Sequence, residues 1–418
     1  MGNVDIDCSK QTVYLFTNKF PFGFGETFLE AEMDSLQNDF DMVVIPTQSH
    51  LSNDHGRAIM NNCIKVDAFL CDRSRLEYYL CSLSMLFSKL FHEELNRRKK
   101  RGILSIKQFV QILGYYGRSK QIARAMIKKY GGTLDKRNSI LYSYWLTEAS
   151  LAEILIKRKL GIYSISRAHG VDVYDGRCVY DTIPGQFDVV KNIDKIFVCS
   201  KNGRNYLQEK YPAYKKNISY SYLGSIDYGF NAGDNRSKAF TLISCSRLVP
   251  GKRVHLIAKA LSNIKDRNIH WIHIGDGRER TRIYEELKDF PKNISCEFLG
   301  DIDHEEVMKY YLENPVNLFI SVSESEGLPV SIMEATSFGI PVIATNVGGT
   351  NEVVNNDLCD LIPPDFEMRD LVDRIYKYVD MDSYTYSSIR EGIRSYWLQN
   401  FCALDNYSTF YENLLKSK

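Results

Sequence analysis

The chain has 418 residues, of which 44% are hydrophobic and 25% charged, and its formal net charge is +1. These values are ordinary for a globular protein long enough for two domains, and with no recognition motif we expect no nucleic-acid partner. No run of eighteen apolar residues and no signal-peptide pattern occur, so we expect neither a membrane-spanning nor a secreted protein.

The cysteine pattern bears on disulfides, metal sites and the cellular compartment. The ten cysteines lie singly along the chain, without a CxxC pair or histidines at metal-ligand spacing. This pattern indicates reduced, mainly structural thiols. We therefore expect a cytoplasmic protein with no metal site.

The first predicted strand, Thr12 to Thr17, leads into a glycine-containing loop. Gly23 and Gly25 precede a helix that Glu26 opens. Two glycines let a phosphate or a sugar lie close to backbone amides. A GxG without a third spaced glycine is a weak dinucleotide motif, so an ordinary turn is an equal alternative.

Residues 76–160 have a mainly helical pattern and hold the strongest charge asymmetry in the chain. Between Lys89 and Lys129 there are twelve Lys and Arg residues and only two acidic ones, Glu93 and Glu94. Apolar and aromatic residues are interleaved with them, as in basic amphipathic helices that bind anionic membranes. A solvated basic face over an ordinary helical core is an equal alternative.

Two features mark the end of the first half. His169 lies in the string SISRAHGVDVY, directly after an apolar segment, although a single histidine is more often structural than catalytic. Further on, Gly224 to Ser237 is rich in Gly, Asn, Asp and Ser. This composition predicts a linker between two domains.

The second half opens with a buried strand, Phe240 to Ser246, and a turn that carries two cations. Arg247 and Lys252 flank this turn before the next helix. A guanidinium makes forked contacts and an ammonium is a compact charge, so the pair suits a diphosphate. Two basic residues in a loop are equally consistent with simple solvent exposure.

Strands and helices then alternate with short glycine turns. His270 to Ile274 precedes a GDG turn, Phe298 to Gly300 ends another strand, and Asp303 to Glu306 predicts a capping box. The alternation indicates a doubly wound parallel sheet, whose ligands lie beyond the carboxyl ends of the strands.

Residues 317–352 predict a strand, a loop, a short helix and a second strand, which together form a parallel βαβ unit. Glu326 in the loop and Glu334 in the helix are separated by seven residues. The backbone amides after Gly327, including that of Leu328, can hold a phosphate. Glu334 can accept both hydrogen bonds from a vicinal diol such as a ribose. Either glutamate by itself would be interpreted as an ordinary solvent-exposed residue.

Taken together, these residues resemble a known family. The string EGLPVSIMEATSFGIPVIAT resembles the E-x7-E motif of retaining glycosyltransferases of family 4, which have the GT-B fold. SRLVPGKRVHLIAKAL resembles the donor-phosphate segment of that family, and SISRAHGVDVY a segment of its first domain. The resemblance covers nearly the whole chain.

The resemblance implies an α/β chain with two Rossmann-like doubly wound domains that face a central cleft. Residues 1–230 would bind the acceptor and carry a basic helical insertion at about 76–160. Residues 231–395 would bind the nucleotide-sugar donor. Residues 396–418 would form a helix that crosses back to the first domain.

The resemblance also implies roles for single residues. Glu334 would bind the donor ribose, Glu326 would lie against the transferred sugar, and His169 would contact that sugar or its phosphate. The remaining assignments are Arg247, Lys252, Gly327 and Leu328 for the diphosphate, Gly300, Asp301 and Ile302 for the base, and Gly23 and Gly25 for the cleft loop.

The activity expected from this resemblance is sugar transfer, with retention, from a nucleotide-diphosphate sugar to a saccharide hydroxyl. We expect a hexosyltransferase of surface-polysaccharide synthesis with a lipid-linked acceptor and neither metal nor cofactor. The protein would be cytoplasmic and peripheral on the inner face of the cell membrane, which it would contact through residues 89–129. Alternatives are another GT-B enzyme, such as an epimerase or a phosphorylase, and a non-catalytic nucleotide-sugar-binding or membrane scaffold protein.

Overall fold

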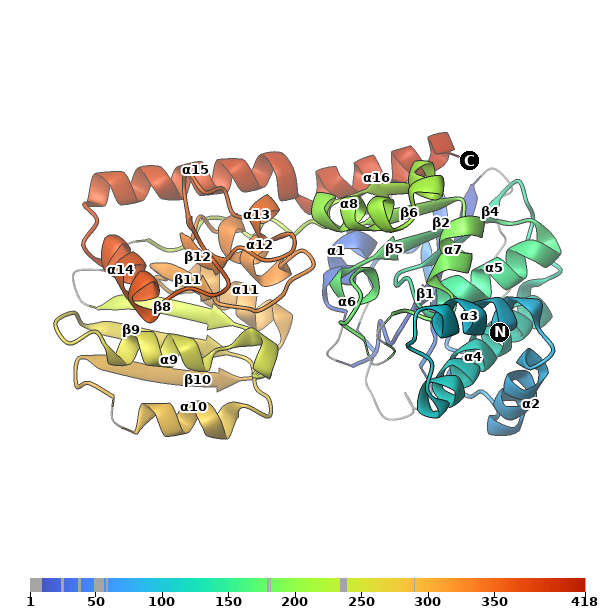
Figure 1. Cartoon of the computed structure of the whole chain (residues 1–418). Helices are drawn as coiled ribbons and strands as arrows, with labels where there is room; N and C mark the ends of the chain where they lie inside the picture. Colours follow the sequence, from blue (N-terminus) through green and yellow to red (C-terminus); the bar gives the residue numbers. More distant parts are fainter. Residues whose placement is uncertain are drawn as a thin grey trace. The chain divides into compact units, whose positions relative to one another are not determined.

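A computed structural model describes residues 10–23, 26–36, 39–48, 56–57, 59–178, 180, 182–233, 239–288 and 290–417. The chain divides into two compact units. The first unit comprises Met1–Tyr222 and Ser408–Lys418, and the second comprises Leu223–Tyr407. Both units are drawn in Figure 1.

The first unit alternates strands with helices. In chain order its elements are β1 Gln11–Thr17, α1 Phe28–Asp34, β2 Phe40–Pro46, β3 Ile64–Val66, α2 Arg75–Met85, α3 Lys89–Lys100, α4 Ile106–Tyr130, β4 Ser139–Ser143, α5 Glu148–Leu160, β5 Tyr163–Ala168, α6 Gly170–Val173, α7 Gln186–Asn192, β6 Lys195–Val198, α8 Lys201–Lys210, the 3-10 helix η1 Pro212–Asn217 and β7 Ile218–Tyr220. The strands form one parallel sheet in the order β3-β2-β1-β4-β5-β6-β7.

The second unit repeats the plan. Its elements are β8 Phe240–Cys245, the 3-10 helix η2 Pro250–Lys252, α9 His255–Ser262, β9 Ile269–Ile274, α10 Arg280–Leu287, β10 Ile294–Gly300, α11 His304–Glu313, β11 Leu318–Ser321, α12 Val330–Ser337, β12 Val342–Thr345, α13 Thr350–Val353, β13 Asp360–Ile362, α14 Met368–Val379 and α15 Ser383–Phe401. The chain ends with α16 Ala403–Ser417, whose residues from Ser408 onward belong to the first unit. Its parallel sheet has the order β10-β9-β8-β11-β12-β13.

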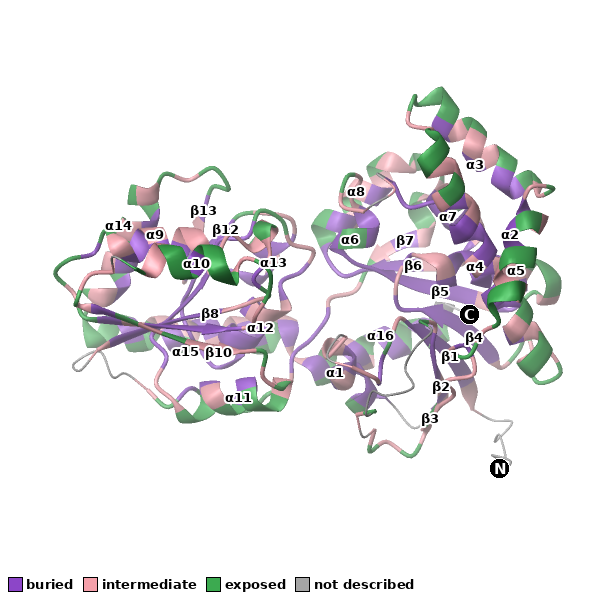
Figure 2. Ribbon diagram, turned by 90° about the horizontal axis from the view of Figure 1, so that it is seen from below, coloured by how far each residue is buried: buried purple, intermediate pink, exposed green. Residues whose placement is uncertain are grey.

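Helices cover both faces of the first sheet, because successive strand residues point to opposite faces. Leu141 packs in a buried cluster with residues of α4 and α5. Its neighbour Tyr142 points the other way and meets Phe410 of α16, with ring centroids 5.7 Å apart. The burial pattern along the strands is visible in Figure 2.

The last helix is tied to the first sheet by a buried polar group. Tyr411 donates a hydrogen bond to the Glu32 carboxylate at 3.2 Å. The Arg167 guanidinium lies 3.4 Å from the same carboxylate and stacks over Phe410. Burial raises the pKa of Glu32, and the charge of Arg167 opposes that rise.

The core of the second unit centres on Trp271 in β9, which is fully buried. Residues of α9 and α14 pack against this face of the sheet, including Ile257, Leu261 and Ile375. The indole N–H of Trp271 donates to Ser244 at 3.0 Å, so burial leaves this donor satisfied.

Most predicted elements are present. The α/β doubly wound class is confirmed by the two parallel sheets, and Asp303 begins α11 with the predicted capping box. The prediction of one helical insertion over residues 76–160 is wrong, because this range contains the central strand β4. A short apolar run such as SILYS does not distinguish a strand from a helix by periodicity.

The boundaries of the compact units differ from the predicted ones. The second unit begins at Leu223 rather than 231, and the chain returns to the first unit at Ser408 rather than 396. Within the described residues, no helix is long and apolar enough to cross a membrane.

The docking of α16 yields the first prediction. Phe410→Ala removes a buried ring that packs on Tyr142, Phe197 and Arg167, and it should destabilise the first unit by about 3–5 kcal/mol in urea unfolding. The matched control is Leu404→Ala on the same helix, where the side chain is largely exposed and the loss should be small. Equal losses in both variants would contradict this account of how the helix is held.

Candidate active site

The candidate site lies in the second unit, at the carboxyl ends of its parallel strands. The strand order reverses between β8 and β11, so the loops that follow these two strands diverge from neighbouring positions. Such a switch point is where open α/β sheets bind ligands. Arg247 and Lys252 follow β8, and Glu326 follows β11.

Lys252 and Glu326 form an ion pair across the switch point. The Lys252 ammonium lies 2.6 Å from Glu326 Oε1, and both side chains are partly exposed. An ammonium has three donors, so Lys252 can keep this contact and still donate to a phosphate oxygen. The pair therefore places a carboxylate within reach of any diphosphate that Lys252 holds.

Backbone contacts fix the loop that carries Glu326. The Glu324 amide donates to the Gly251 carbonyl at 2.8 Å, and the Gly349 amide donates to the Gly327 carbonyl at 2.9 Å. Gly348 has a φ of +55°, and a Cβ there would lie 1.9 Å from the Glu326 carbonyl oxygen. Only glycine fits this position without moving the loop.

Helix α12 begins just after this loop. Its first regular hydrogen bond runs from the Met333 amide to the Pro329 carbonyl, so the amides before Met333 are the free N-terminal donors of the helix. Gly327 is partly exposed, and the buried side chain of Leu328 anchors the turn. These positions suit the predicted phosphate contacts.

Glu334 in α12 is held by a histidine that sequence analysis missed. His304 Nε2 lies 2.8 Å from Glu334 Oε1 and comes from the first turn of α11. Glu334 Oε2 makes no hydrogen bond with any described residue and remains available to a hydroxyl. His304 orients the carboxylate, and the sequence signal that could have located it is its place directly after the Asp303 cap.

The other assigned residues of this unit lie on neighbouring loops. Arg247 is exposed, directly after β8. Gly300 has a φ of +73°, and its carbonyl accepts the Gly275 amide at 2.8 Å. The Asp301 carboxylate accepts a hydrogen bond from the Asp276 amide at 2.9 Å and so holds the two turns together. Ile302 is the next residue in the chain.

The glycine loop of the first unit is built differently from the expectation. The amides of Asn18, Lys19 and Phe20 all donate to the Glu26 carboxylate at 2.7–3.0 Å. Glu26 thus occupies the amide donors that an anion would use. Gly23 has a φ of +68°, and Gly25 lies outside the described residues.

His169 is a buried, neutral side chain of the same unit. The centroids of the His169 and Trp145 rings are 4.4 Å apart. Neither nitrogen of the His169 ring has a hydrogen-bond partner among the described residues. Burial, together with the charge of Arg167, lowers the pKa of His169 to about 3. Asp172 accepts the His169 amide, and burial raises the pKa of Asp172 to about 7. An uncharged imidazole can donate or accept one hydrogen bond, but it supplies no charge at neutral pH.

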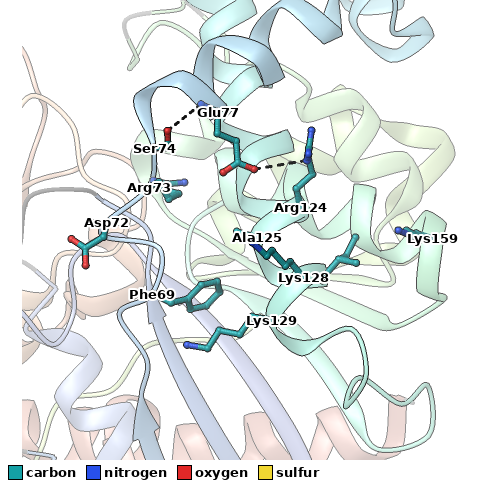
Figure 3. A pocket seen from close by; sticks show the side chains of 11 residues that line it. Phe69, Asp72, Arg73, Ser74, Glu77, Arg124, Ala125, Lys128, Lys129 and Lys159 are labelled. Carbon is teal, nitrogen blue, oxygen red and sulfur yellow. Dashed lines mark hydrogen bonds and ion pairs between the residues drawn. The ribbon is translucent and has the colours of Figure 1, made fainter.

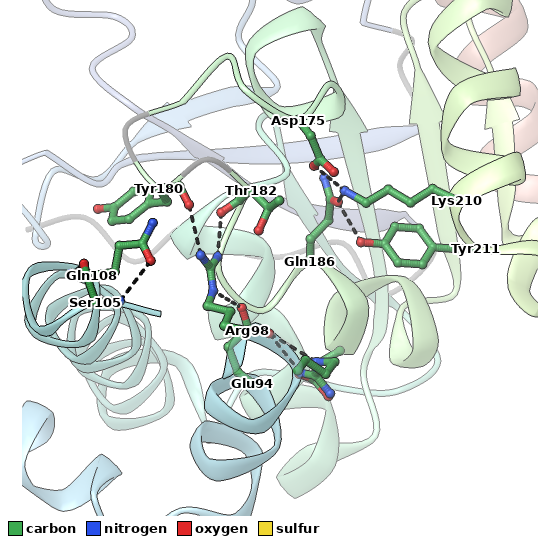
Figure 4. Close-up of polar contacts among 12 residues, drawn as sticks. Glu94, Arg98, Ser105, Gln108, Asp175, Tyr180, Thr182, Gln186, Lys210 and Tyr211 are labelled. Atoms are coloured by element: carbon green, nitrogen blue, oxygen red, sulfur yellow. Dashed lines mark hydrogen bonds and ion pairs between the residues drawn. The ribbon is translucent and has the colours of Figure 1, made fainter. Parts of the chain in front are cut away.

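The basic segment 89–129 is largely engaged within the protein. Arg98 is buried and donates to Glu94 and to the carbonyls of Tyr180 and Thr182 at 2.6–2.9 Å (Figure 4). Six further cations of the segment pair with carboxylates: Lys89, Arg97, Arg101, Arg118, Arg124 and Lys129. Seven of the twelve cations, Arg98 included, therefore have a carboxylate partner within the protein, and membrane binding through this segment stays a prediction.

Comparisons with known proteins find similarity mainly in the second unit. Residues 230–394 match the family model described as glycosyl transferases group 1. The chain is 30% identical to the O-antigen biosynthesis glycosyltransferase WclY of Escherichia coli over 161 residues, which cover 37% of this chain and 44% of that protein. It is 25% identical to the putative colanic acid biosynthesis glycosyltransferase WcaL of Escherichia coli K12, over 51% of this chain and 55% of the relative. The chain thus spans about half the length of these curated relatives.

A solved structure matches the whole fold. The Anabaena protein HepE in complex with UDP superimposes with a TM-score of 0.66 at 14% identity, over 97% of this chain and all of the other. The similarity concerns the fold, and it confirms the predicted GT-B class.

The contact between His304 and Glu334 generates a prediction. His304→Ala should weaken the binding of a ribonucleoside diphosphate about tenfold or more, because a hydrogen bond to a charged group contributes about 1.5–3 kcal/mol. The affinity for the 2′,3′-dideoxy analogue should change little, since it has no diol for Glu334. His304→Gln keeps an N–H donor and is the matched control. Equal losses for both ligands would contradict the orienting role.

The lowered pKa of His169 gives a prediction about the pH dependence of stability. Because the unfolded chain protonates this histidine near pH 6.5 and the folded chain only near pH 3, its stabilising contribution is lost as the pH falls through that window. Between pH 8 and pH 5 the native protein should lose about 2 kcal/mol more stability than His169→Gln, measured by urea unfolding at each pH. Identical losses would show that the histidine is not held neutral.

Proposed function

We propose that this chain, whose residues 230–394 match the glycosyl transferases group 1 family and whose fold is GT-B, transfers a sugar from a nucleotide-diphosphate donor to a saccharide hydroxyl. The observation that carries the proposal is the ion pair of Lys252 and Glu326 at the switch point. Glu334 follows in α12 with one oxygen free for a ribose. A cation, a carboxylate and a diol acceptor are the groups that a nucleotide sugar requires.

The donor would lie along the carboxyl ends of β8, β10 and β11. Arg247, Lys252 and the amides at the start of α12 take the diphosphate, and Glu334 takes the ribose. The base lies against residues 300–302, where the glycine-rich turns let a flat ring approach the backbone. HepE was solved with UDP, so uridine nucleotides are the first donors to test.

The barrier to transfer is charge separation. As the bond between the anomeric carbon and the phosphate oxygen breaks, the diphosphate gains negative charge and the sugar ring gains positive charge. Lys252 and Arg247 stabilise the diphosphate, and Glu326 stabilises the ring. The acceptor oxygen then bonds to the anomeric carbon on the face that the diphosphate leaves. Attack on this face gives retention. The proton of the acceptor hydroxyl passes to the departing phosphate oxygen, and this step needs no metal.

The relatives support a proposal for the acceptor class. WclY and WcaL are named for O-antigen and colanic acid biosynthesis, and we propose by analogy that this chain is a hexosyltransferase that contributes to a surface polysaccharide. With a lipid-linked acceptor, the protein would work at the inner face of the cell membrane. The exposed cations of residues 89–129 would contribute to that contact.

Replacing the glutamate of the ion pair tests the proposal. Glu326→Gln should lower sugar transfer by roughly 100-fold to 1,000-fold, the usual effect of removing one stabilising group from a transition state, while nucleoside diphosphate affinity changes only a few-fold. Glu324→Gln is the matched control, because that side chain is exposed two residues away. The rate of sugar transfer to a lipid-linked acceptor is measured from the nucleoside diphosphate that the reaction releases.

Two outcomes would contradict the proposal. Unchanged transfer in Glu326→Gln would remove this carboxylate from the mechanism. Tight donor binding without transfer in the native protein, across all acceptors tried, would favour a non-catalytic binding protein.

A further inference from the structure

Helix α2 presents its apolar side to solvent. Leu76, Tyr79, Leu80 and Leu83 recur at the spacing of one helix face, and each is more than half exposed. Phe87, just after the helix, continues the stripe and is 90% exposed. In an ordinary surface helix these side chains would face the core.

The buried side of α2 packs closely on α4, which explains this orientation. The buried residues of α2 are Cys81, Ser82 and Met85. A Cβ at Gly117 of α4 would lie 1.9 Å from Ser82 Oγ, and one at Gly114 would lie 2.6 Å from Tyr78 Oη. The two helices therefore approach closely through small residues, and this fixed packing leaves the leucines outside.

Helix α4 has exposed apolar side chains of its own. Ile106 and Val110 lie one turn apart in its first turns, and they are 87% and 61% exposed. We term the α2 stripe with Phe87 the apolar face: Leu76, Tyr79, Leu80, Leu83 and Phe87. Surface this apolar is unusual on a protein exposed only to water.

Charge indicates what covers the apolar face. Residues 75–130 hold thirteen Lys and Arg against three Glu. Several of these cations are paired internally, but Lys99, Lys100, Lys107 and Lys128 remain exposed. A second copy of the chain would bring the same positive charge against the face. An anionic bilayer offers both the apolar layer and the opposite charge.

A hollow beside the N-terminal end of α2 adds a site for a phosphate. It has a volume of about 860 Å³ and is lined by Phe69, Asp72, Arg73, Ser74, Glu77, Arg124, Ala125, Ile127, Lys128, Lys129 and Lys159 (Figure 3). Lys128 and Lys159 make no ion pair with the described residues. Two nitrogens of Arg73 are buried and have no hydrogen-bond partner among the residues that the structure describes. The hollow thus offers unused donors and positive charge to an anion.

We propose that the apolar face inserts into the interfacial layer of an anionic bilayer while the cationic hollow holds the phosphate of a lipid headgroup that carries a net negative charge, unlike the zwitterionic headgroup of phosphatidylcholine. This contact deepens the membrane contact proposed above for residues 89–129 and rests on it: its centre is α2, and Arg124, Lys128 and Lys129 of that segment line the hollow. It does not depend on the proposed sugar transfer. The helix lies on the membrane and does not span it.

The first test is sedimentation of the full chain with vesicles of phosphatidylcholine, with and without phosphatidylglycerol. Native protein should bind the anionic vesicles, and Leu80→Glu with Leu83→Glu should lower the bound fraction about tenfold. Leu404→Glu, at an exposed leucine of the second unit, is the matched control and should bind like the native protein. Thermal unfolding of each variant checks the fold, and all replaced side chains are exposed.

The second test separates the hollow from the apolar face. Lys128→Glu with Lys159→Glu should remove the preference for phosphatidylglycerol and leave weak binding to neutral vesicles. Equal native binding to neutral and anionic vesicles would overturn the phosphate site. Unchanged vesicle binding in the leucine variant, or a native dimer that the same variant dissociates in sedimentation velocity, would overturn the membrane contact.

Discussion

The ion pair of Lys252 and Glu326 is the contact on which the candidate site depends. It joins the loops that follow β8 and β11, where the strand order of the second sheet reverses. Backbone bonds to Gly251 and Gly327 fix the same loops, and Gly348 leaves just enough room beside them. The site is therefore a property of sheet topology as much as of its side chains, since only this strand order brings the two loops together.

The first unit is organised around buried polar groups. Its buried polar groups, such as Glu32 with Arg167, hold the last helix against the sheet. Glu26 fills the amide donors of the first loop, and His169 is kept neutral by burial. The departure from ordinary packing lies at α2, whose apolar side faces outward. Apolar side chains are usually buried, and positions that depart from such a general pattern are commonly functional. The exposed apolar side chains of α2 depart from it.

The sequence predicts the second unit well, because its strands are short apolar runs and its glutamates stand at a distinctive spacing. It does not predict contacts between residues distant in the chain. His304 reaches Glu334 only once α11 and α12 are packed, and Arg98 donates to carbonyls far along the chain. The charge count over residues 89–129 therefore indicates a membrane contact but misses the apolar face of α2, whose direction is set by Gly117.

The central claim is that this arrangement binds a nucleotide-diphosphate sugar. The most direct measurement is thermal unfolding against a panel of nucleotides and nucleotide sugars, since a ligand that binds only the folded state raises the melting temperature. We expect a clear shift with one nucleoside diphosphate and its sugar, without added metal, and a much smaller shift when Arg247 and Lys252 are both replaced by Ala. No shift with any ligand in the folded native protein would contradict the account.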